Sequence, residues 1–190
     1  MSLEDTRTAA GGSAATAAEP RWLTDAEQHT WRAWLEVMRL LPAQLEDRLH
    51  DRHDLNLTDY QVLVELSESA EGKLRMTELA NHTSLSKSRL SHQIGRMEKS
   101  GLVERQDCPS DRRGAFAVIT EQGWAVLRSA APGHVDDVRE LFIDLMSPEE
   151  IEVVGRAMGV IAGKLRQSPG LGCANAMAET QAAARARAAA

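Results

Sequence analysis

The fold is decided by residues 76–119, which read MTELANHTSLSKSRLSHQIGRMEKSGLVERQDCPSDRRGAFAVI. The stretch predicts a short helix over 76–81, a tight polar turn over 82–85 and a second helix over 86–100. Two helices joined by such a turn form a helix-turn-helix unit, which holds its second helix out on the surface of a domain.

A hairpin follows the second helix. Its expected strands cover 102–106 and 115–119, which contain Val, Phe and Ile, and its tip covers 107–114, where Pro, Ser, Asp and Gly favour a turn. A helix-turn-helix followed by a hairpin with a charged tip presents one helix and one basic loop to a DNA duplex. The order of elements therefore predicts a winged helix-turn-helix.

The second helix has two different faces. The helical period places Leu90, Ile94 and Met97 on one apolar face. The opposite face is polar and basic, and its short hydroxyl groups allow the helix to approach base edges in a major groove. Its N-terminus also favours phosphate. The predicted DNA contacts from this helix are Ser86, Lys87, Ser88, Arg89, Ser91, His92 and Arg96.

The tip of the hairpin carries Asp111, Arg112 and Arg113, followed by Gly114. A long guanidinium on a narrow loop suits a minor groove. Asp111 lies two residues before Arg113, and we expect it to pair with that guanidinium and hold the side chain extended. These three residues complete the predicted DNA contacts.

The same stretch resembles the MarR family, the multiple antibiotic resistance regulators. The resemblance rests on residues 85–96, on KSGLVER at 99–105 and above all on DRRG at 111–114, and the order of elements extends it over about residues 23–166. It implies that the helix beginning at Ser86 reads the major groove and that Arg113 enters the minor groove. It also implies a transcriptional regulator whose terminal helices interleave in a homodimer.

The distribution of charge favours a nucleic-acid partner, although the net charge of the chain is −6. Residues 73–113 hold nine Lys and Arg against five acids, a local charge of +4 that leaves −10 for the remainder. A duplex responds to the field at the contact surface, so the local sign matters more than the total.

Size and composition are those of one compact domain with tails, or of one domain plus a small accessory domain. Of the 190 residues, 43% are apolar, which is enough to build a core. No apolar run approaches the roughly eighteen residues of a membrane span, and no secretion signal is indicated. Two cysteines, Cys108 and Cys173, do not make a disulfide framework. We therefore expect a cytoplasmic protein that does not associate with membranes.

Three apolar helical repeats lie outside the winged unit, over about 24–49, 120–146 and 147–165. A single copy has little to bury them against, so association of the terminal helices from two copies is the economical solution. The predicted fold is mainly α with a small β-hairpin wing, a winged helix-turn-helix whose N- and C-terminal helices form a dimerisation region. The expected divisions are a disordered tail (1–20), an N-terminal dimerisation helix (21–56), the DNA-binding module (57–120), C-terminal dimerisation helices (121–167) and a disordered Ala-rich tail (168–190).

The sequence lacks the usual signs of catalysis, so we predict that the protein is not an enzyme and uses no cofactor. It has no Gly-rich phosphate loop and no G-x-S-x-G elbow. Ser88 and His92 share a helix face, but no acid orients the histidine. The predicted function is a sequence-specific transcriptional regulator, a homodimeric repressor of a pseudo-palindromic DNA operator. A non-specific or architectural DNA-binding dimer and a purely structural helical dimer are the alternatives.

The resemblance further implies a small phenolic or anionic ligand, which binds between the dimer helices and the DNA-binding module and releases the operator. On that analogy the candidate lining residues are Trp31, Trp34, His53, Tyr60 and Arg75. For the two tryptophans, a place in the apolar helix seam is the alternative.

Metal-responsive or redox-responsive regulation is a further alternative. His50 and His53 lie near two aspartates and offer ligands for zinc, although histidines at a helix end are more often simply solvated. Cys108 lies in the hairpin, where oxidation would disturb DNA contact, but a redox switch usually needs a lowered thiol pKa and a partner. We therefore assign neither a metal site nor a redox site.

Overall fold

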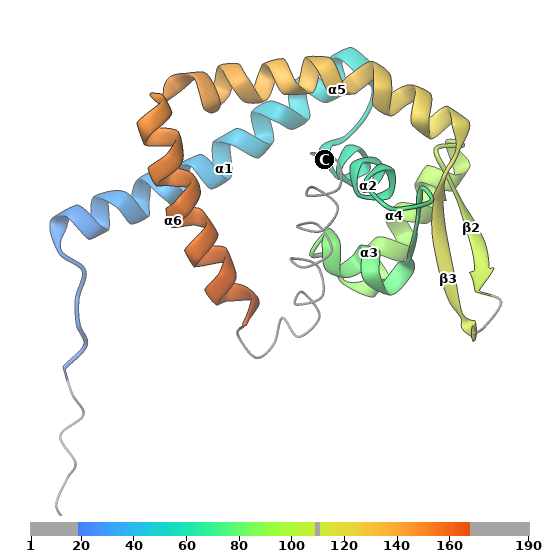
Figure 1. Ribbon diagram of the computed structural model, residues 1–190, viewed down its shortest axis with the longest axis horizontal. Coiled ribbons are helices and arrows are strands. Elements are labelled where there is room, and N and C mark those ends of the chain that lie inside the picture. Colours follow the sequence, from blue (N-terminus) through green and yellow to red (C-terminus); the bar gives the residue numbers. More distant parts are fainter. Residues whose placement is uncertain (1–18, 109–110, 168–190) are drawn as a thin grey trace, which may run out of the picture. The chain divides into compact units, whose positions relative to one another are not determined.

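The structure, a computed structural model, describes residues 19–108 and 111–167, without the side chains of residues 111–113. The chain divides into two units, residues 1–37 and 38–190. The elements, labelled in Figure 1, are α1 (Asp25–His53), α2 (Leu57–Ser67), β1 (Lys73–Arg75), α3 (Met76–His82), α4 (Lys87–Lys99), β2 (Val103–Cys108), β3 (Asp111–Ile119), α5 (Glu121–Leu141), the 3-10 turn η1 (Ile143–Leu145) and α6 (Pro148–Arg166). This architecture confirms the predicted winged helix-turn-helix. The disorder predicted for 1–20 and 168–190 concerns, apart from residues 19 and 20, parts of the chain outside the described residues.

In the first unit, the described residues 19–37 include the beginning of α1. Thr24 caps this helix, because its hydroxyl accepts a hydrogen bond from the Glu27 backbone N–H at 3.3 Å and its own N–H donates to the Glu27 carboxylate at 2.8 Å. These two hydrogen bonds satisfy backbone donors that the helix start leaves without a partner.

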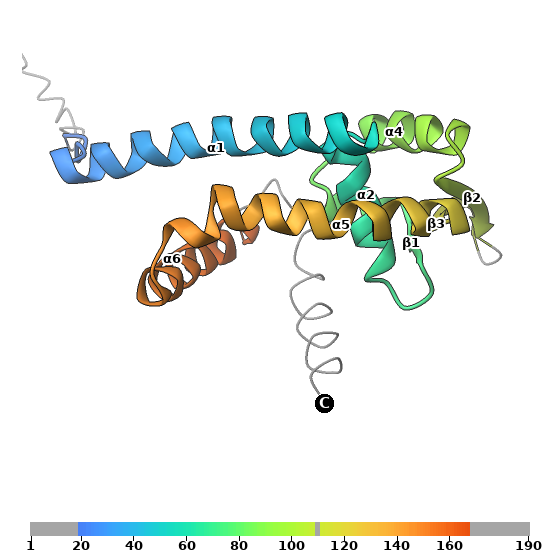
Figure 2. The ribbon, with the colours of Figure 1, turned by 90° about the horizontal axis from the view of Figure 1, so that it is seen from above.

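The second unit has its core where α2, α3 and α4 meet the sheet. The fully buried side chains include Leu63 and Leu66 of α2, Leu79 of α3, and Leu90 and Ile94 of α4. In two views α2 and α4 lie near the strands (Figures 1 and 2), and α3 packs against α4 and β3 (Figure 1). The apolar face predicted for the second helix of the unit is therefore the face that packs into this core.

The sheet has three strands in the order β1-β3-β2, and both pairings are antiparallel. The sequence predicted the two hairpin strands but not β1, whose three residues are too few for an alternating pattern. Here β1 pairs Lys73 with Val118 and Arg75 with Phe116. The hairpin strands are also longer than predicted, because β3 begins at Asp111 and β2 continues to Cys108.

Two glycines are required by the backbone near the start of the wing, one at a sharp turn and one at a close packing contact. Gly101 has φ of +71°, and its N–H and that of Leu102 donate to the carbonyl oxygens of Glu98 and Met97 at 3.0 and 2.9 Å. This is the Schellman ending of a helix, in which glycine avoids the strain of a side chain. At Gly123, in the first turn of α5, a Cβ atom would lie 2.2 Å from the Leu102 carbonyl oxygen. Because Gly123 has no side chain, α5 packs directly against the Leu102 backbone at the start of the wing.

The C-terminal part of α1 is joined to α5 by buried charge. Asp137 of α5 is 3% exposed, and its two carboxylate oxygens accept hydrogen bonds from Arg48 and Arg52 of α1, each at 2.8 Å. Burial would raise the pKa of Asp137, but the two guanidinium groups outweigh burial and lower it. The helix predicted over 24–49 continues to His53. Arg52, one of the two partners of Asp137, lies in this additional turn.

The helix predicted over 120–146 is shorter in the structure. It ends at Leu141, because Phe142 leaves the helical conformation with φ of −143°, and the 3-10 turn η1 follows. The expected start of α6 is confirmed. Ser147 caps the helix, Pro148 is its first residue, and the Glu150 carboxylate accepts the Ser147 N–H at 2.8 Å.

Candidate nucleic-acid interface

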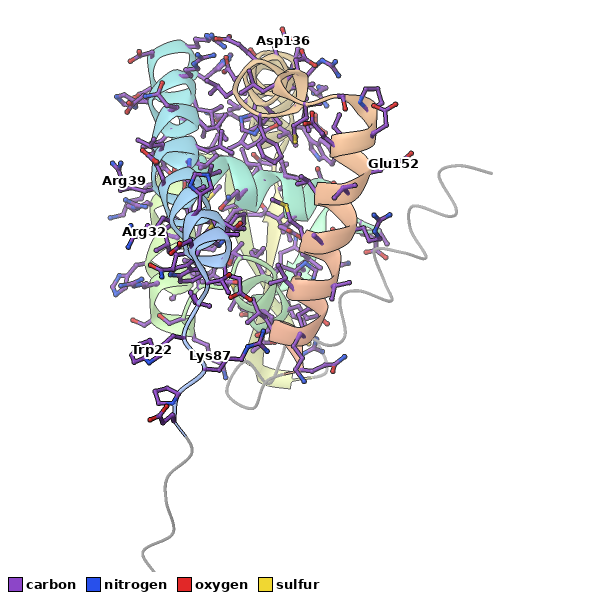
Figure 3. All side chains as sticks on the ribbon, turned by 90° about the vertical axis from the view of Figure 1, so that its left-hand side faces the viewer. Trp22, Arg32, Arg39, Lys87, Asp136 and Glu152 are labelled. Atoms are coloured by element: carbon purple, nitrogen blue, oxygen red, sulfur yellow. The ribbon has the colours of Figure 1, made fainter. Side chains whose placement is uncertain are left out.

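The exposed face of α4 is the candidate interface. The helix begins after Ser86, whose hydroxyl accepts a hydrogen bond from the Arg89 N–H at 3.3 Å. Leu90, Ile94 and Met97 are buried, which fixes the rotation of the helix about its axis. The seven residues predicted to contact DNA from this helix are all exposed: Ser86, Lys87, Ser88, Arg89, Ser91, His92 and Arg96. Lys87, labelled in Figure 3, marks the first turn of this face.

The chemistry of this face matches a duplex. Its N-terminal half has small hydroxyl side chains, which permit close approach, together with Lys87 and Arg89, which supply positive charge. Backbone N–H groups at a helix start add a partial positive charge in the same place. The face therefore offers both hydrogen-bonding groups for base edges and cations for phosphates.

The wing is held against α4 by Arg105 of β2. One terminal nitrogen of its guanidinium lies 2.7 Å from the Ser91 carbonyl oxygen and 3.3 Å from the Ser91 hydroxyl. Its Nε atom lies 3.5 Å from the Glu98 carboxylate, which also accepts the Arg105 backbone N–H at 3.1 Å. Arg105 therefore joins the strand to the helix, and it was not among the predicted site residues.

The structure does not describe the side chains of the three predicted tip residues. Asp111, Arg112 and Arg113 begin β3, and Asp111 pairs with Cys108 across the hairpin. Pro109 and the side chains of 111–113 lie outside the described residues. The predicted Asp111–Arg113 pairing and the minor-groove role of Arg113 remain predictions.

Gln93 was also not among the predicted site residues. This residue of α4 is 7% exposed and is one of two buried polar residues among those that the structure describes. Its side-chain amide donates to Asp59 of α2 and accepts from Arg96. Its place beside Ile94 and between the apolar positions 90 and 97 was the available signal, because it puts Gln93 at the edge of the buried face.

Comparison with known proteins agrees with this geometry. The sequence model of the MarR family matches residues 53–114. The structure of AbsC, a MarR family transcriptional regulator from Streptomyces coelicolor, has 52% sequence identity, covers 78% of this chain and 100% of that chain, and superposes with a TM-score of 0.75. The chain belongs to the MarR family.

Two other relatives support the same conclusion. Sco3205, a MarR family transcriptional regulator from Streptomyces coelicolor whose structure is of a complex with DNA, is 45% identical, with 80% of this chain and 95% of that chain covered and a TM-score of 0.76. The transcriptional regulator HosA from Escherichia coli O111:H- is 31% identical over 122 residues, 64% of this chain and 88% of its own length. The protein is thus a MarR family transcriptional regulator, and these relatives are regulators rather than enzymes.

One candidate ligand residue of this MarR family protein lines a cavity of the second unit. The cavity has a volume of about 370 Å³ and is lined by α1, α2 and α5, with Tyr60, Glu65 and His134 among its polar residues. The rings of Tyr60 and His134 lie 4.4 Å apart between centroids. Burial raises the pKa of Tyr60 and lowers that of His134, so both groups are held in their neutral forms at pH 7.

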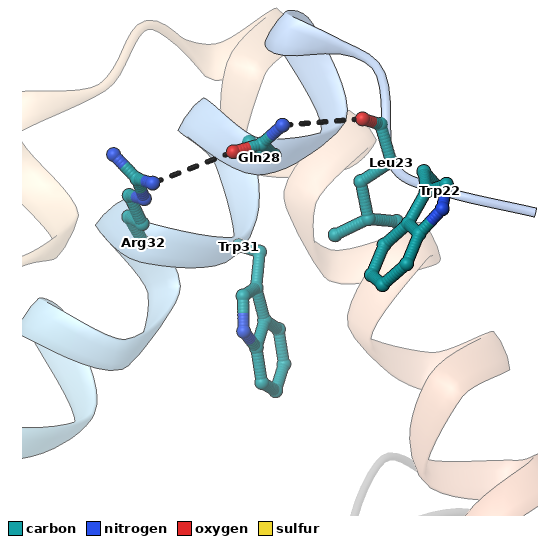
Figure 4. A pocket seen from close by; sticks show the side chains of 5 residues that line it. All are labelled: Trp22, Leu23, Gln28, Trp31 and Arg32. Carbon is teal, nitrogen blue, oxygen red and sulfur yellow. Dashed lines mark hydrogen bonds between the residues drawn. The ribbon is translucent and has the colours of Figure 1, made fainter.

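Another candidate, Trp31, lines a separate cavity in the first unit. This cavity has a volume of about 300 Å³ and is formed by Trp22, Leu23, Gln28, Trp31 and Arg32, as Figure 4 shows. Gln28 accepts a hydrogen bond from Arg32 and donates one to the Leu23 carbonyl oxygen at 3.2 Å. Trp31 is 53% exposed, so it is not core within the unit.

The other candidate ligand residues line neither of these two cavities. Trp34 is exposed and His53 is half-buried. The Arg75 guanidinium lies 5.2 Å from the centre of the Phe116 ring and 3.1 Å from the Cys108 sulfur. The five residues predicted from the resemblance are therefore distributed over several places, and their role in ligand binding remains a prediction.

The alternative sensing sites are a zinc site near His50 and His53 and a redox site at Cys108. Within residues 19–108 and 111–167, no group of three or more His, Cys, Asp or Glu side chains is placed to hold a metal ion. His50 lies 3.6 Å from Asp54, as an ordinary surface pair. No helix in the described part of the chain has the length and apolar run needed to cross a membrane.

Proposed function

We propose that this MarR family regulator is a homodimeric repressor that binds a pseudo-palindromic operator, with α4 in the major groove and the wing in the minor groove. The observation that carries the proposal is the division of α4 into a core face, fixed by Leu90, Ile94 and Met97, and an exposed polar and basic face. A helix held in this way can enter a major groove without unpacking its domain. The DNA complex of Sco3205, 45% identical, supports the extension to this chain.

The proposed roles follow the chemistry of each side chain. Ser88 and His92 are one helical turn apart and offer hydrogen bonds to base edges. Lys87 lies at the helix start and neutralises phosphate. Arg113 supplies a cation to the minor groove. Base contacts set the preferred sequence, whereas the cations contribute affinity for any duplex.

The proposed dimer rests on exposed apolar side chains of α6. Ile161 and Leu165, which lie four residues apart on the apolar repeat of α6, are 59 and 55% exposed. A second copy is the simplest cover for this face. Figure 3 shows that α5 and α6 also carry charged side chains that point outward, such as Asp136 and Glu152. A two-fold dimer would present two α4 helices to half-sites about 34 Å apart.

The proposed release of the operator uses a small phenolic or anionic ligand. The cavity of about 370 Å³ beside Tyr60 and His134 lies within the range of sizes that hold small molecules. The cavity is lined by residues of α1, α2 and α5, and α2 shares the buried core with α4. A ligand seated there would act on the elements that hold α4.

The test is selection of bound sequences from random duplexes by the purified protein at two salt concentrations. We expect a two-fold-symmetric motif. His92→Ala should then relax the preference at one position in each half-site, by about 1–3 kcal/mol for a good hydrogen-bonded contact. Arg128→Ala is the control, because Arg128 is exposed on α5 and is not among the predicted contacts. Salt-sensitive binding without a motif would overturn the proposal and favour a non-specific or architectural DNA-binding protein.

A further inference from the structure

Gln93 connects two charged groups that lie on different helices. Its amide nitrogen donates to one oxygen of the Asp59 carboxylate in α2, and its amide oxygen accepts from the guanidinium of Arg96 in α4. Gln93 itself is buried, whereas Arg96 is exposed on the shoulder of the DNA-facing side. A continuous path of hydrogen bonds therefore runs from α2 to the edge of the candidate interface.

The two ends of this path fix the orientation of the amide. An ionised carboxylate only accepts hydrogen bonds, and a guanidinium only donates them. The Gln93 nitrogen must therefore face Asp59, and its oxygen must face Arg96. Glutamine is suited to this place because it carries one acceptor and donors at the end of the same side chain. The reversed amide would set donor against donor at Arg96 and acceptor against acceptor at Asp59, so both hydrogen bonds of Gln93 would be lost.

Asp59 is itself firmly placed. Its second oxygen accepts a hydrogen bond from the Asn56 side chain, and its backbone N–H donates to the Asn56 side-chain oxygen at 2.7 Å. Asn56 is the N-cap of α2. Burial raises the pKa of Asp59, while Gln93, Arg96 and Asn56 oppose that rise. The carboxylate is thus a fixed point in the domain against which Gln93 is aligned.

Arg96 keeps most of its capacity to bind DNA in this arrangement. A guanidinium has five N–H donors, so the hydrogen bond to Gln93 leaves others for phosphate or base. Fixing a long side chain before binding also reduces the conformational entropy lost in the complex. Arg89, on the same helix, is exposed and its side chain makes no such hydrogen bond to Gln93. Two arginines of one helix therefore differ in whether the domain orients them.

We propose that Asp59 and Gln93 are positioning residues that hold the Arg96 guanidinium in its DNA-binding orientation and thereby raise affinity for the operator. This inference rests on the proposed function, because it requires that α4 contacts DNA. Gln93 and Asp59 act only through Arg96. Their replacement therefore lowers affinity when Arg96 is present and has no effect when Arg96 is absent.

The experiment is a double-mutant cycle on binding to the operator obtained by selection. Gln93→Met keeps the volume of the side chain and removes both hydrogen bonds, and we expect about a tenfold loss of operator affinity. In an Arg96→Ala background the same replacement should change affinity by less than about twofold. In an Arg89→Ala background, the matched control, Gln93→Met should retain its full effect.

A structural role alone gives a different result. If Gln93→Met merely loosened the fold, operator affinity would fall by the same factor in the wild-type and the Arg96→Ala backgrounds. That result would overturn the proposal. The salt dependence of binding gives a second readout. Gln93→Met should leave its slope unchanged, because no cation is lost, whereas Arg96→Ala should lower it by about one.

Two further results separate this proposal from the proposed function. Wild-type protein that binds no duplex would overturn the proposed function itself, whereas specific binding with an additive cycle would overturn only the positioning role. If Gln93→Met fails to unfold cooperatively, Asp59→Ala takes its place in the same cycle. That variant removes both acceptor oxygens from the other end of the path. It should therefore lower operator affinity in the wild-type background and leave it unchanged in the Arg96→Ala background.

Discussion

Helices α4 and α6 carry apolar residues at the same three- and four-residue spacing, but only α4 buries them within the chain. Ile94 of α4 is 0% exposed, whereas Ile161 of α6 is 59% exposed. Leu90 and Met97 are buried with Ile94, whereas Leu165, one turn from Ile161 on the same face, is 55% exposed. Periodicity thus shows which residues share a face. It does not show whether that face is covered by the same chain.

The largest expected effect separates the two isoleucines. Ile94→Ala should lower the free energy of unfolding by about 2–5 kcal/mol, because it leaves a cavity in the core. Ile161→Ala should cost less than about 0.5 kcal/mol when unfolding is measured at concentrations where copies do not associate. Urea unfolding followed by circular dichroism gives both values. Equal losses for the two variants would mean that α6 is packed within the single chain.

The next effect concerns the ion pair that joins α5 to α1. Asp137→Ala should lower the free energy of unfolding by about 1–3 kcal/mol, because the hydrogen bonds to Arg48 and Arg52 are lost. The folded-state pKa of Asp137 is lowered from 3.8, so its stabilisation is present above that pH and is lost as the pH falls through the lower folded value.

Acid titration of stability tests this sign. The wild type should lose stability relative to Asp137→Asn as the pH is lowered below about 4. Glu152→Gln, which removes an exposed carboxylate of α6, is the control variant. A constant difference between wild type and Asp137→Asn from pH 7 to pH 2 would contradict the lowered pKa.

A third prediction concerns the uncovered face of α6. If a second copy covers it, Ile161→Asp should raise the dimer dissociation constant by at least about tenfold, because a charge would be buried without a partner. Analytical ultracentrifugation measures this constant. Glu152→Ala, on the same helix, should leave it unchanged. A wild-type protein that stays monomeric at micromolar concentration would remove the basis of the dimer.

The smallest expected effect compares two helix caps. Thr120 caps α5, and its hydroxyl also donates to the Gly101 carbonyl oxygen at 2.6 Å, next to the core of the winged unit. Ser147 caps the exposed α6. Thr120→Ala should cost about 1–2 kcal/mol and Ser147→Ala about 0.5–1 kcal/mol in thermal unfolding. A larger loss for Ser147→Ala would show that α6 contributes more to the fold than its exposure indicates.

Much of the winged unit followed from local patterns. The two faces of α4 and the hairpin depend on residues close together in the sequence, and so does the capped start of α6 at Ser147, outside the winged unit. The third strand did not, because three residues carry no period and β1 exists only through its pairing with β3. Arg105 and Gln93 were missed for a related reason. Arg105 of β2 bonds to Ser91 of α4, and Gln93 of α4 bonds to Asp59 of α2, so both partners lie on other elements.

The order of the main helices and of the hairpin, the buried face of α4 and the family could be inferred from the sequence alone, because helical period, turn residues and the DRRG motif are local properties. Tertiary structure decided which polar side chains meet. Asp59 and Gln93 are 34 residues apart, and Arg48 and Asp137 are 89 apart. Such pairs form only when packing brings two helices together, because hydrogen bonds depend on distance and direction in space.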